Sequence, residues 1–141
     1  MNLTKLMELL KKHEGFSATA YRDTKGILTI GYGRNLEAMT VTQEQAGMWL
    51  AEDSANAIKQ AMKFPEFAHC DTHARQNVFV ELIYNIGAGK VAKFKKMLAA
   101  ITAHDWNKAA DELYDSKWRI DVGPTRSGTL ISMLRTGEFP K

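Results

Sequence analysis

The spacing of the hydrophobic residues changes twice in the first third of the chain, and this constrains the fold more than any other feature. Before Gly15, apolar residues recur at helical spacing, at Leu3, Leu6, Met7 and Leu10. This spacing predicts an amphipathic helix of about three turns that Gly15 ends. From Ala18 to Asn35 the chain is rich in β-formers around the turn residues Asp23-Thr24-Lys25-Gly26, which predicts a small antiparallel hairpin sheet.

The pattern after Asn35 is helical to the end of the chain. A helix with Thr42 as its N-cap is predicted to run to Met62 and to end before Pro65; it would be about 30 Å long. Further helices are predicted over Thr72–Ile86 with Asp71 as cap, over Val91–Ala103, after Asp105, and from Pro124 to Gly137.

These elements predict an α+β domain that is mainly α and has two lobes. The expected boundaries are about 14–41 for a small hairpin lobe, about 42–62 for a linking helix, and about 63–141 plus the N-terminal helix for a helical lobe. We expect a cleft between the lobes. With 141 residues the chain forms one domain that can bury a core without covalent bridges.

Composition limits the class of protein without choosing its function. Cys70 is the only cysteine, which excludes an intrachain disulfide scaffold. The first residues contain no apolar run that resembles a signal peptide or a membrane span. The net charge of +3 favours contact with anionic polymers, which include nucleic acid, cell wall and lipid surfaces.

Glu14, Asp23 and Thr29 are the candidates for chemistry. Hydrolysis of a glycosidic bond needs an acid for the leaving oxygen, a base for water, and a group that holds this water. Each residue also has a purely structural interpretation. Glu14 can be a surface residue at a helix end, Asp23 a turn former, and Thr29 a strand residue.

Other possible sites are weaker. His69, Cys70 and His73 do not match the ligand spacing of a zinc site, so no metal is predicted. Lysines at positions 90, 93, 95 and 96 spread around a helix without interleaved aromatics, which favours a solvated face over nucleic-acid binding. Two of the three tryptophans are expected in the core. Arg126 follows Gly123-Pro124-Thr125 at a helix start, a position that a carboxylate partner would explain.

The ordered motifs of the first 33 residues resemble those of the phage-type lysozymes, the endolysins of T-even-like phages in glycoside hydrolase family 24. These motifs are Glu14-Gly15, Tyr21-Arg22-Asp23-Thr24, Gly26 and Thr29-Ile30-Gly31-Tyr32-Gly33. Further matches follow in order, at Tyr84-Asn85-Ile86-Gly87, Phe94 with Leu98, Trp106-Asn107-Lys108-Ala109-Ala110, Ser116-Lys117-Trp118, Pro124-Thr125-Arg126 and Arg135-Thr136-Gly137. The resemblance covers nearly the whole chain.

The resemblance implies a lysozyme-like fold and a role for each matching residue. Glu14 would be the general acid, Asp23 would position or activate water as base, and Thr29 would hold the water. Arg126 would lie beside the catalytic Glu. The implied substrate-binding residues are Asn35, Tyr84, Asn85 and Arg126.

The sequence departs from this family at two places. Arg34 stands where many members have a histidine, so the His–carboxylate pair of those members is absent. The segment between Asn35 and Thr42 is short, which predicts a trimmed small lobe.

The implied activity is hydrolysis of the β-1,4 bond between N-acetylmuramic acid and N-acetylglucosamine in peptidoglycan, without a cofactor. We expect a monomer with no nucleic-acid partner and no stable membrane association. By family, the enzyme would be made in the bacterial cytoplasm, reach the wall through a separate phage pore, and lyse the host. The alternatives are a lytic transglycosylase and a non-catalytic module that binds cell wall or nucleic acid.

Overall fold

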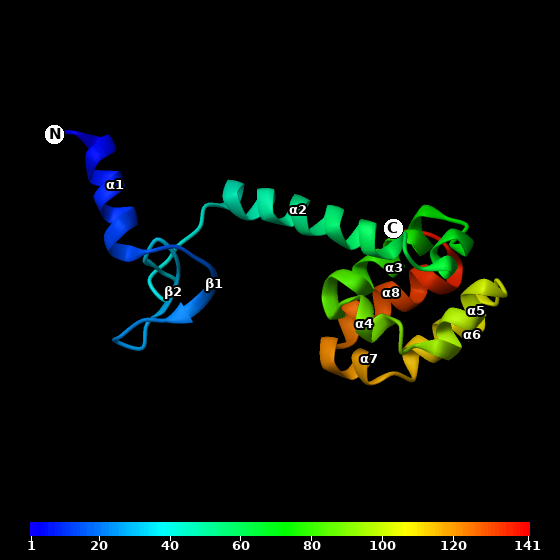
Figure 1. The fold of residues 1–141 in the computed structure, drawn as a ribbon. Helices are drawn as coiled ribbons and strands as arrows, with labels where there is room; N and C mark the ends of the chain where they lie inside the picture. Colours follow the sequence, from blue (N-terminus) through cyan, green and yellow to red (C-terminus); the bar gives the residue numbers. More distant parts are fainter. The chain divides into compact units, whose positions relative to one another are not determined.

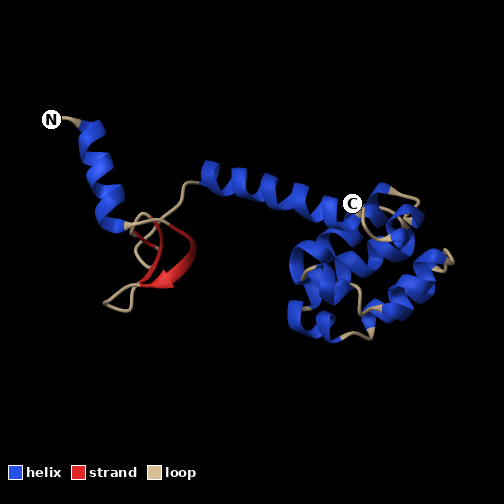
Figure 2. Ribbon diagram, in the orientation of Figure 1, coloured by secondary structure: helices blue, strands red, loops and turns tan.

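The computed structural model describes all residues from Met1 to Lys141, in two compact units, Met1–Ala46 and Gly47–Lys141. Most of the chain is helical (Figures 1 and 2). The strands form one three-stranded antiparallel sheet. This confirms the predicted α+β class. No helix is both long enough and apolar enough to cross a membrane.

The N-terminal unit begins with helix α1 (Leu3–Glu14), whose ends follow from local side-chain and backbone chemistry. The side-chain oxygen of Asn2 accepts the backbone N–H of Lys5 at 3.1 Å and caps the first turn. Gly15 ends the helix at φ 70°, a conformation that glycine adopts without the steric cost of a Cβ atom. The predicted helix and its stop are both confirmed.

The sheet contains β1 (Ser17–Arg22), β2 (Leu28–Gly31) and β3 (Arg34–Asn35), in this order. In the register, Thr29 of the central strand lies opposite Tyr21 on one side and Asn35 on the other. The predicted turn joins β1 to β2, because the N–H of Gly26 donates to the carbonyl of Asp23 at 2.9 Å.

Helix α2 (Gln43–Ala61) begins with the predicted cap and ends one residue before Met62, the predicted end. The hydroxyl of Thr42 accepts the N–H of Gln45 at 3.1 Å, and the Gln45 side chain accepts the N–H of Thr42 at 3.1 Å. This reciprocal pair is a capping box. Pro65 does not end α2 directly; it occupies the first turn of a separate 3-10 helix, η1 (Pro65–His69).

Six α-helices follow in the C-terminal unit. They are α3 (His73–Ile86), α4 (Ala88–Val91), α5 (Lys95–Thr102), α6 (Trp106–Tyr114), α7 (Lys117–Val122) and α8 (Pro124–Thr136). The predicted Asp105 cap and Gly137 stop are confirmed, since Asp105 accepts the N–H of Lys108 and Gly137 has a left-handed conformation.

Two helix predictions in this unit were wrong in detail. The cap of α3 is Thr72, whose hydroxyl accepts the N–H of Arg75 at 3.2 Å, while the neighbouring Asp71 pairs with the Arg75 side chain. The predicted helix over Val91–Ala103 begins only at Lys95, because Val91 ends the short helix α4 and the chain leaves helical geometry at Phe94 (ψ 56°). Helices η1 and α7 were not predicted.

The core of the C-terminal unit lies among α3, α5, α6 and α8. Its largest fully buried side chains are Phe79, Leu82, Met97, Ile101, Leu113, Leu130 and Leu134. Trp118 is buried and Trp106 packs against the core, whereas Trp49 is 46% exposed, which confirms the prediction that two of the three tryptophans are core residues.

Cys70 belongs to this core, and its thiol is buried. Burial, with a smaller contribution from the carboxylate of Asp71, raises the pKa of the Cys70 thiol from 9.0 to about 12. The thiol is therefore protonated at neutral pH and acts as a small apolar side chain. No group of three or more His, Cys, Asp or Glu side chains is arranged to hold a metal ion.

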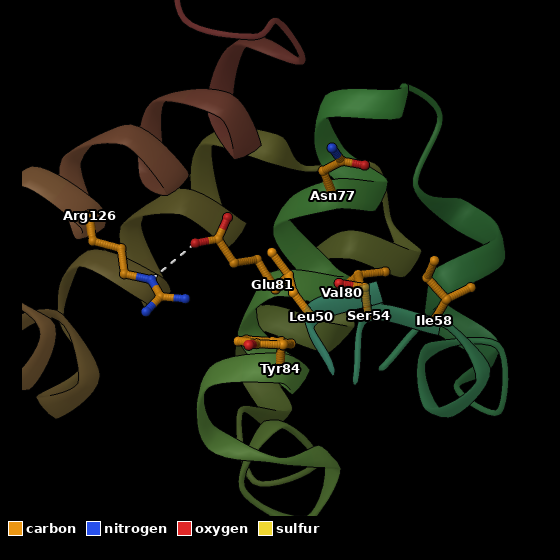
Figure 3. Close-up of a pocket in the computed structure, with 8 residues that line it drawn as sticks. All are labelled: Leu50, Ser54, Ile58, Asn77, Val80, Glu81, Tyr84 and Arg126. Carbon is orange, nitrogen blue, oxygen red and sulfur yellow. Dashed lines mark hydrogen bonds and ion pairs between the residues drawn. The ribbon is translucent and has the colours of Figure 1, made fainter. Parts of the chain in front are cut away.

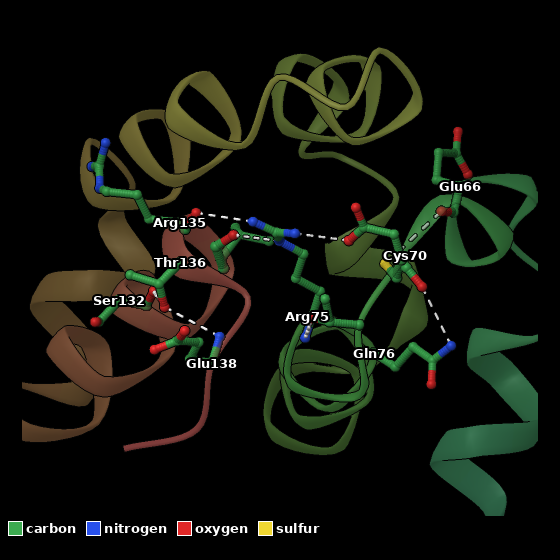
Figure 4. A network of polar contacts seen from close by, with 11 residues as sticks. Glu66, Cys70, Arg75, Gln76, Ser132, Arg135, Thr136 and Glu138 are labelled. Carbon is green, nitrogen blue, oxygen red and sulfur yellow. Dashed lines mark hydrogen bonds and ion pairs between the residues drawn. The ribbon is translucent and has the colours of Figure 1, made fainter. Parts of the chain in front are cut away.

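The buried side chain of Arg75 joins the start of α3 to the end of α8 (Figure 4). Its guanidinium donates to the carbonyls of Leu134 and Arg135, each at 3.0 Å, and to the carboxylate of Asp71 at 2.8 Å. The same group lies 4.1 Å from the ring centre of Trp106. Arg75 thus satisfies terminal carbonyls of α8 that have no partner within the helix.

We predict that Arg75→Ala lowers the free energy of unfolding by about 3 kcal/mol, because it leaves buried carbonyls without a donor and removes a buried cation from its partners. Urea unfolding followed by circular dichroism measures this. Arg135→Ala is the control: its ion pair with Asp111 is partly exposed, so it should cost less than about 1 kcal/mol. Equal effects of the two substitutions would contradict the prediction.

Candidate active site

Glu14, the last residue of α1, lies against the backbone of Gly33 in the N-terminal unit. A Cβ atom at Gly33 would overlap the carboxyl group of Glu14, and Gly33 also has a positive φ of 74°. The atoms that would overlap belong to the end of an exposed side chain, so an alanine at Gly33 would force the Glu14 carboxyl group to move. Gly33 therefore allows the Glu14 carboxyl group to lie against the backbone that follows β2.

Asp23 follows β1 and shapes the turn to β2. Its Oδ1 accepts the N–H groups of Lys25 at 2.8 Å and of Ile27 at 2.9 Å. This arrangement is the turn-forming role foreseen for an Asp in this position. The other carboxylate oxygen, Oδ2, makes no hydrogen bond within the unit and is free to accept a proton.

Thr29 is the most enclosed residue of the sheet, with 4% of its surface exposed. Its hydroxyl donates to the carbonyl of Ile27 at 2.8 Å. Because the hydroxyl proton is used in this bond, the remaining lone pairs of the oxygen can accept a hydrogen bond from a water molecule. The predicted water-holding role of Thr29 is chemically available but stays a prediction.

Asn35 lies beside Thr29 on β3 and is exposed. Its side-chain oxygen accepts the N–H groups of Glu37 at 2.9 Å and Ala38 at 3.1 Å, and so fixes the turn that leaves the sheet. The neighbouring Arg34, in place of the family's common histidine, is exposed opposite Ile30. Saccharide contact by Asn35 stays a prediction.

The C-terminal unit holds the other predicted residues, and Tyr84 and Arg126 lie together there. They line one groove of about 410 Å³ with Leu50, Ser54, Ile58, Asn77, Val80 and Glu81 (Figure 3). The Nε atom of Arg126 donates to Oε1 of Glu81 at 3.0 Å. Arg126 thus has the carboxylate partner that its position predicts. The contact with Glu14 implied by resemblance joins the two units and stays a prediction.

Asn85 has a different surrounding from Tyr84, although the two are adjacent. Its side-chain oxygen accepts the indole N–H of the buried Trp118 at 2.8 Å. This bond joins the end of α3 to α7. Asn85 therefore has a clear structural role, and its predicted contact with substrate stays a prediction.

Two residues of these sites were missed by reasoning from sequence. Gly33 entered the sequence analysis only as part of the strand motif, and no signal there indicates that it accommodates Glu14. Glu81 was not singled out, although helical spacing places it on the same face of α3 as Asn77 and Tyr84. This spacing could have predicted that Glu81 lies next to Tyr84. The sequence does not predict that Glu81 pairs with Arg126.

Comparison with known proteins decides the family. A family model described as "Phage lysozyme" matches residues 11–134, a span that contains every predicted site residue. The chain belongs to the phage lysozyme family. The matched span reaches from the end of α1 into α8, so both units are part of the phage lysozyme match.

Individual relatives agree with this family. "Probable T4-type lysozyme 2" of Dictyostelium discoideum is 27% identical, and the match covers 96% of each chain. "Peptidoglycan hydrolase gp36" of Pseudomonas phage phiKMV is 30% identical over 89% of this chain and 14% of its own length. "Pre-baseplate central spike protein Gp5" of Enterobacteria phage T4 is 28% identical over 80% of this chain and 24% of its own length. These similarities support a lysozyme-type peptidoglycan hydrolase.

We predict that Gly33→Ala lowers kcat at least tenfold (about 1.4 kcal/mol), because the added methyl group displaces the Glu14 carboxyl group from its position. Turbidity clearing of purified peptidoglycan measures the rate. The control is Gly26→Ala, at a φ of 78° with no atom within 4 Å of the added Cβ, which shares the backbone strain but not the overlap. Comparable losses in both variants would show that strain alone is responsible.

Proposed function

We propose that this phage lysozyme hydrolyses the β-1,4 bond between N-acetylmuramic acid and N-acetylglucosamine in peptidoglycan, with inversion at the anomeric carbon. The observation that carries the proposal is the arrangement of the N-terminal unit. The Glu14 carboxyl group lies against Gly33, and the same sheet carries the Asp23 turn and the enclosed Thr29 hydroxyl.

In this mechanism Glu14 donates its proton to the leaving glycosidic oxygen as the bond to the anomeric carbon breaks. A water molecule attacks that carbon from the opposite face of the sugar. Oδ2 of Asp23 accepts the proton that the water loses, and Thr29 orients the water by accepting a hydrogen bond from it. This role requires the two carboxyl groups to lie about 6.5–9.5 Å apart during the reaction, so that water fits between substrate and base.

Substrate contacts are proposed for Asn35, Tyr84, Asn85 and Arg126. Tyr84 is 45% exposed in the groove, so its ring is available to a saccharide. The basic net charge of +3 suits an anionic wall polymer. As part of the same proposal, the enzyme acts as a monomer on the wall during host lysis, after synthesis in the bacterial cytoplasm and release through a separate phage pore.

We predict that Glu14→Gln lowers the rate at which purified peptidoglycan is cleared by a factor of about a thousand or more. Binding of this variant to the wall should be retained. Glu8→Gln, which removes a carboxylate from the same helix, is the control and should keep full activity. Clearing by Glu14→Gln at the wild-type rate would exclude the mechanism and favour a binding module.

Asp23→Asn separates the two roles of Asp23. The amide oxygen can still accept the N–H groups of Lys25 and Ile27, so the turn is kept, but the side chain can no longer take a proton. A loss of activity with an unchanged unfolding midpoint is expected in this variant. Full activity of Asp23→Asn would exclude the base role.

The products distinguish hydrolysis from the action of a lytic transglycosylase. A transglycosylase needs the acid but no base for water, and it leaves a 1,6-anhydro-muramyl end. We predict that mass spectra of the digest show reducing muramyl ends, each heavier by one water molecule than the corresponding anhydro end. Anhydro ends in the digest would overturn the proposed hydrolysis.

A further inference from the structure

Four lysines lie close together along the chain where α4 gives way to α5 in the C-terminal unit. Lys90 lies in the last turn of α4, Lys93 lies in the turn between the helices, and Lys95 and Lys96 begin α5. We call these four residues the lysine patch. No other Lys, Arg, Asp or Glu residue occurs between positions 82 and 104, so the segment carries only positive charge from these residue types.

The side chains of the lysine patch are all exposed, and none of them has a carboxylate partner within the C-terminal unit. The ion pairs of this unit join other residues. The N–H of Lys93 donates to the carbonyl of Lys90 at 3.1 Å, which keeps the turn compact. Charges that lie within about 8 Å of each other repel at physiological salt, so the patch is a local concentration of uncompensated positive charge.

Helix α5 adds to this positive potential. Lys95 and Lys96 occupy its first turn, where the helix dipole is positive and disfavours a cation. The N-cap residue Phe94 has no side chain that accepts a hydrogen bond from this turn. Both lysines therefore cost stability at these positions, and no ion pair within the unit offsets the cost. An anion outside the chain would offset it.

Apolar neighbours fix the backbone of the lysine patch. Val91 is fully buried, Met97 and Leu98 belong to the core, and Phe94 packs against that core. No large hydrophobic side chain of this segment is exposed. The patch therefore offers charge alone, without an apolar side chain that could insert into a bilayer or an aromatic ring that could stack on nucleic-acid bases.

We propose that the lysine patch adsorbs the protein reversibly to an anionic phospholipid surface. Four lysines without an arginine favour phosphate over carboxylate, because an ammonium group binds phosphate as a point charge, whereas arginine suits the two oxygens of a carboxylate. Each lysine near an anionic leaflet strengthens binding about fivefold.

This adsorption goes beyond the proposed function and does not depend on it. Because no apolar side chain inserts, salt should reverse the adsorption, which is compatible with the expected absence of stable membrane association. In the proposed route of release, the enzyme meets such a surface before it reaches the wall.

Co-sedimentation with lipid vesicles tests the proposal. The probes are vesicles of phosphatidylcholine alone and vesicles in which about a third of the lipid is phosphatidylglycerol. Wild type should bind only the anionic vesicles, and about 0.5 M salt should release it. The fourfold variant Lys90→Gln, Lys93→Gln, Lys95→Gln and Lys96→Gln should lower the partition coefficient on anionic vesicles about a hundredfold. Wild-type binding to neutral vesicles with equal strength would overturn the proposal.

The control is a second fourfold variant that removes the same charge from exposed lysines outside the patch: Lys59→Gln, Lys63→Gln, Lys108→Gln and Lys141→Gln. It should lower the partition coefficient less than about fivefold. Both variants should keep the wild-type unfolding midpoint, because they alter only exposed side chains. Equal losses of vesicle binding in the two variants would overturn the proposal, since net charge alone would then explain the adsorption.

Duplex DNA and purified peptidoglycan are the competing partners. Binding of DNA that needs the lysine patch and is tighter than vesicle binding would overturn the proposal in favour of nucleic acid. Slower clearing of peptidoglycan by the patch variant, with unchanged vesicle binding, would overturn it in favour of the wall. The vesicle assay contains no glycan, so its result is independent of whether the proposed hydrolysis is correct.

Discussion

The approach of the Glu14 carboxyl group to the backbone of Gly33 is the contact on which the proposed catalytic role of the N-terminal unit depends. It brings the last residue of a helix to the turn between β2 and β3, at a position where an added Cβ atom would overlap this carboxyl group. The unit has little else to fix this geometry, because Thr29 is its only residue below a tenth exposed. Capping bonds, four glycines with positive φ and the Asp23 turn define it instead, through local chemistry.

The C-terminal unit, in contrast, is stabilised by a hydrophobic core. Its helices share a core of large apolar side chains, and Arg75 closes that core by satisfying carbonyls at the end of α8. The groove with Glu81 and Arg126 lies on the outer face of α3, whose opposite face is buried. Two helices that pack on this core, α3 and α8, thus carry Tyr84 and Arg126, which we propose to meet the substrate, and this suits the positioning of a charged group.

Local signals explain how much of this could be read from the sequence. Gly15, Thr42, Asp105 and Gly137 bound helices as predicted, because each acts on backbone groups a few residues away. Asp71 and Thr72 are residue types that both cap helices well, so the sequence does not say which of them caps α3. In the structure Asp71 pairs with the side chain of Arg75, and Thr72 accepts the backbone N–H of Arg75 as the cap. No glycine or proline marks the break at Phe94, so the periodicity suggested one continuous helix there.

The residues of the candidate site show the same difference between local signals and contacts over long distances in the sequence. Glu14, Asp23 and Thr29 were identified because motif order within a short stretch is visible in sequence, whereas their roles in catalysis remain proposals. The pair between Glu81 and Arg126 joins residues 45 positions apart, and no local rule indicates such a contact. The role of Gly33 depends on the path of the backbone, which composition and spacing do not specify.

The buried state of Cys70 has a practical consequence for spectroscopy. A thiol with a pKa of about 12 contains almost no thiolate at neutral pH, and thiolate is the species that reacts with maleimide or methanethiosulfonate labels. A cysteine introduced at an exposed position in each unit, for example at Lys25 and Lys108, would therefore take up label while the native thiol stays silent. Distances between the two units, with and without glycan, become measurable by fluorescence transfer or electron spin resonance in an otherwise unaltered chain.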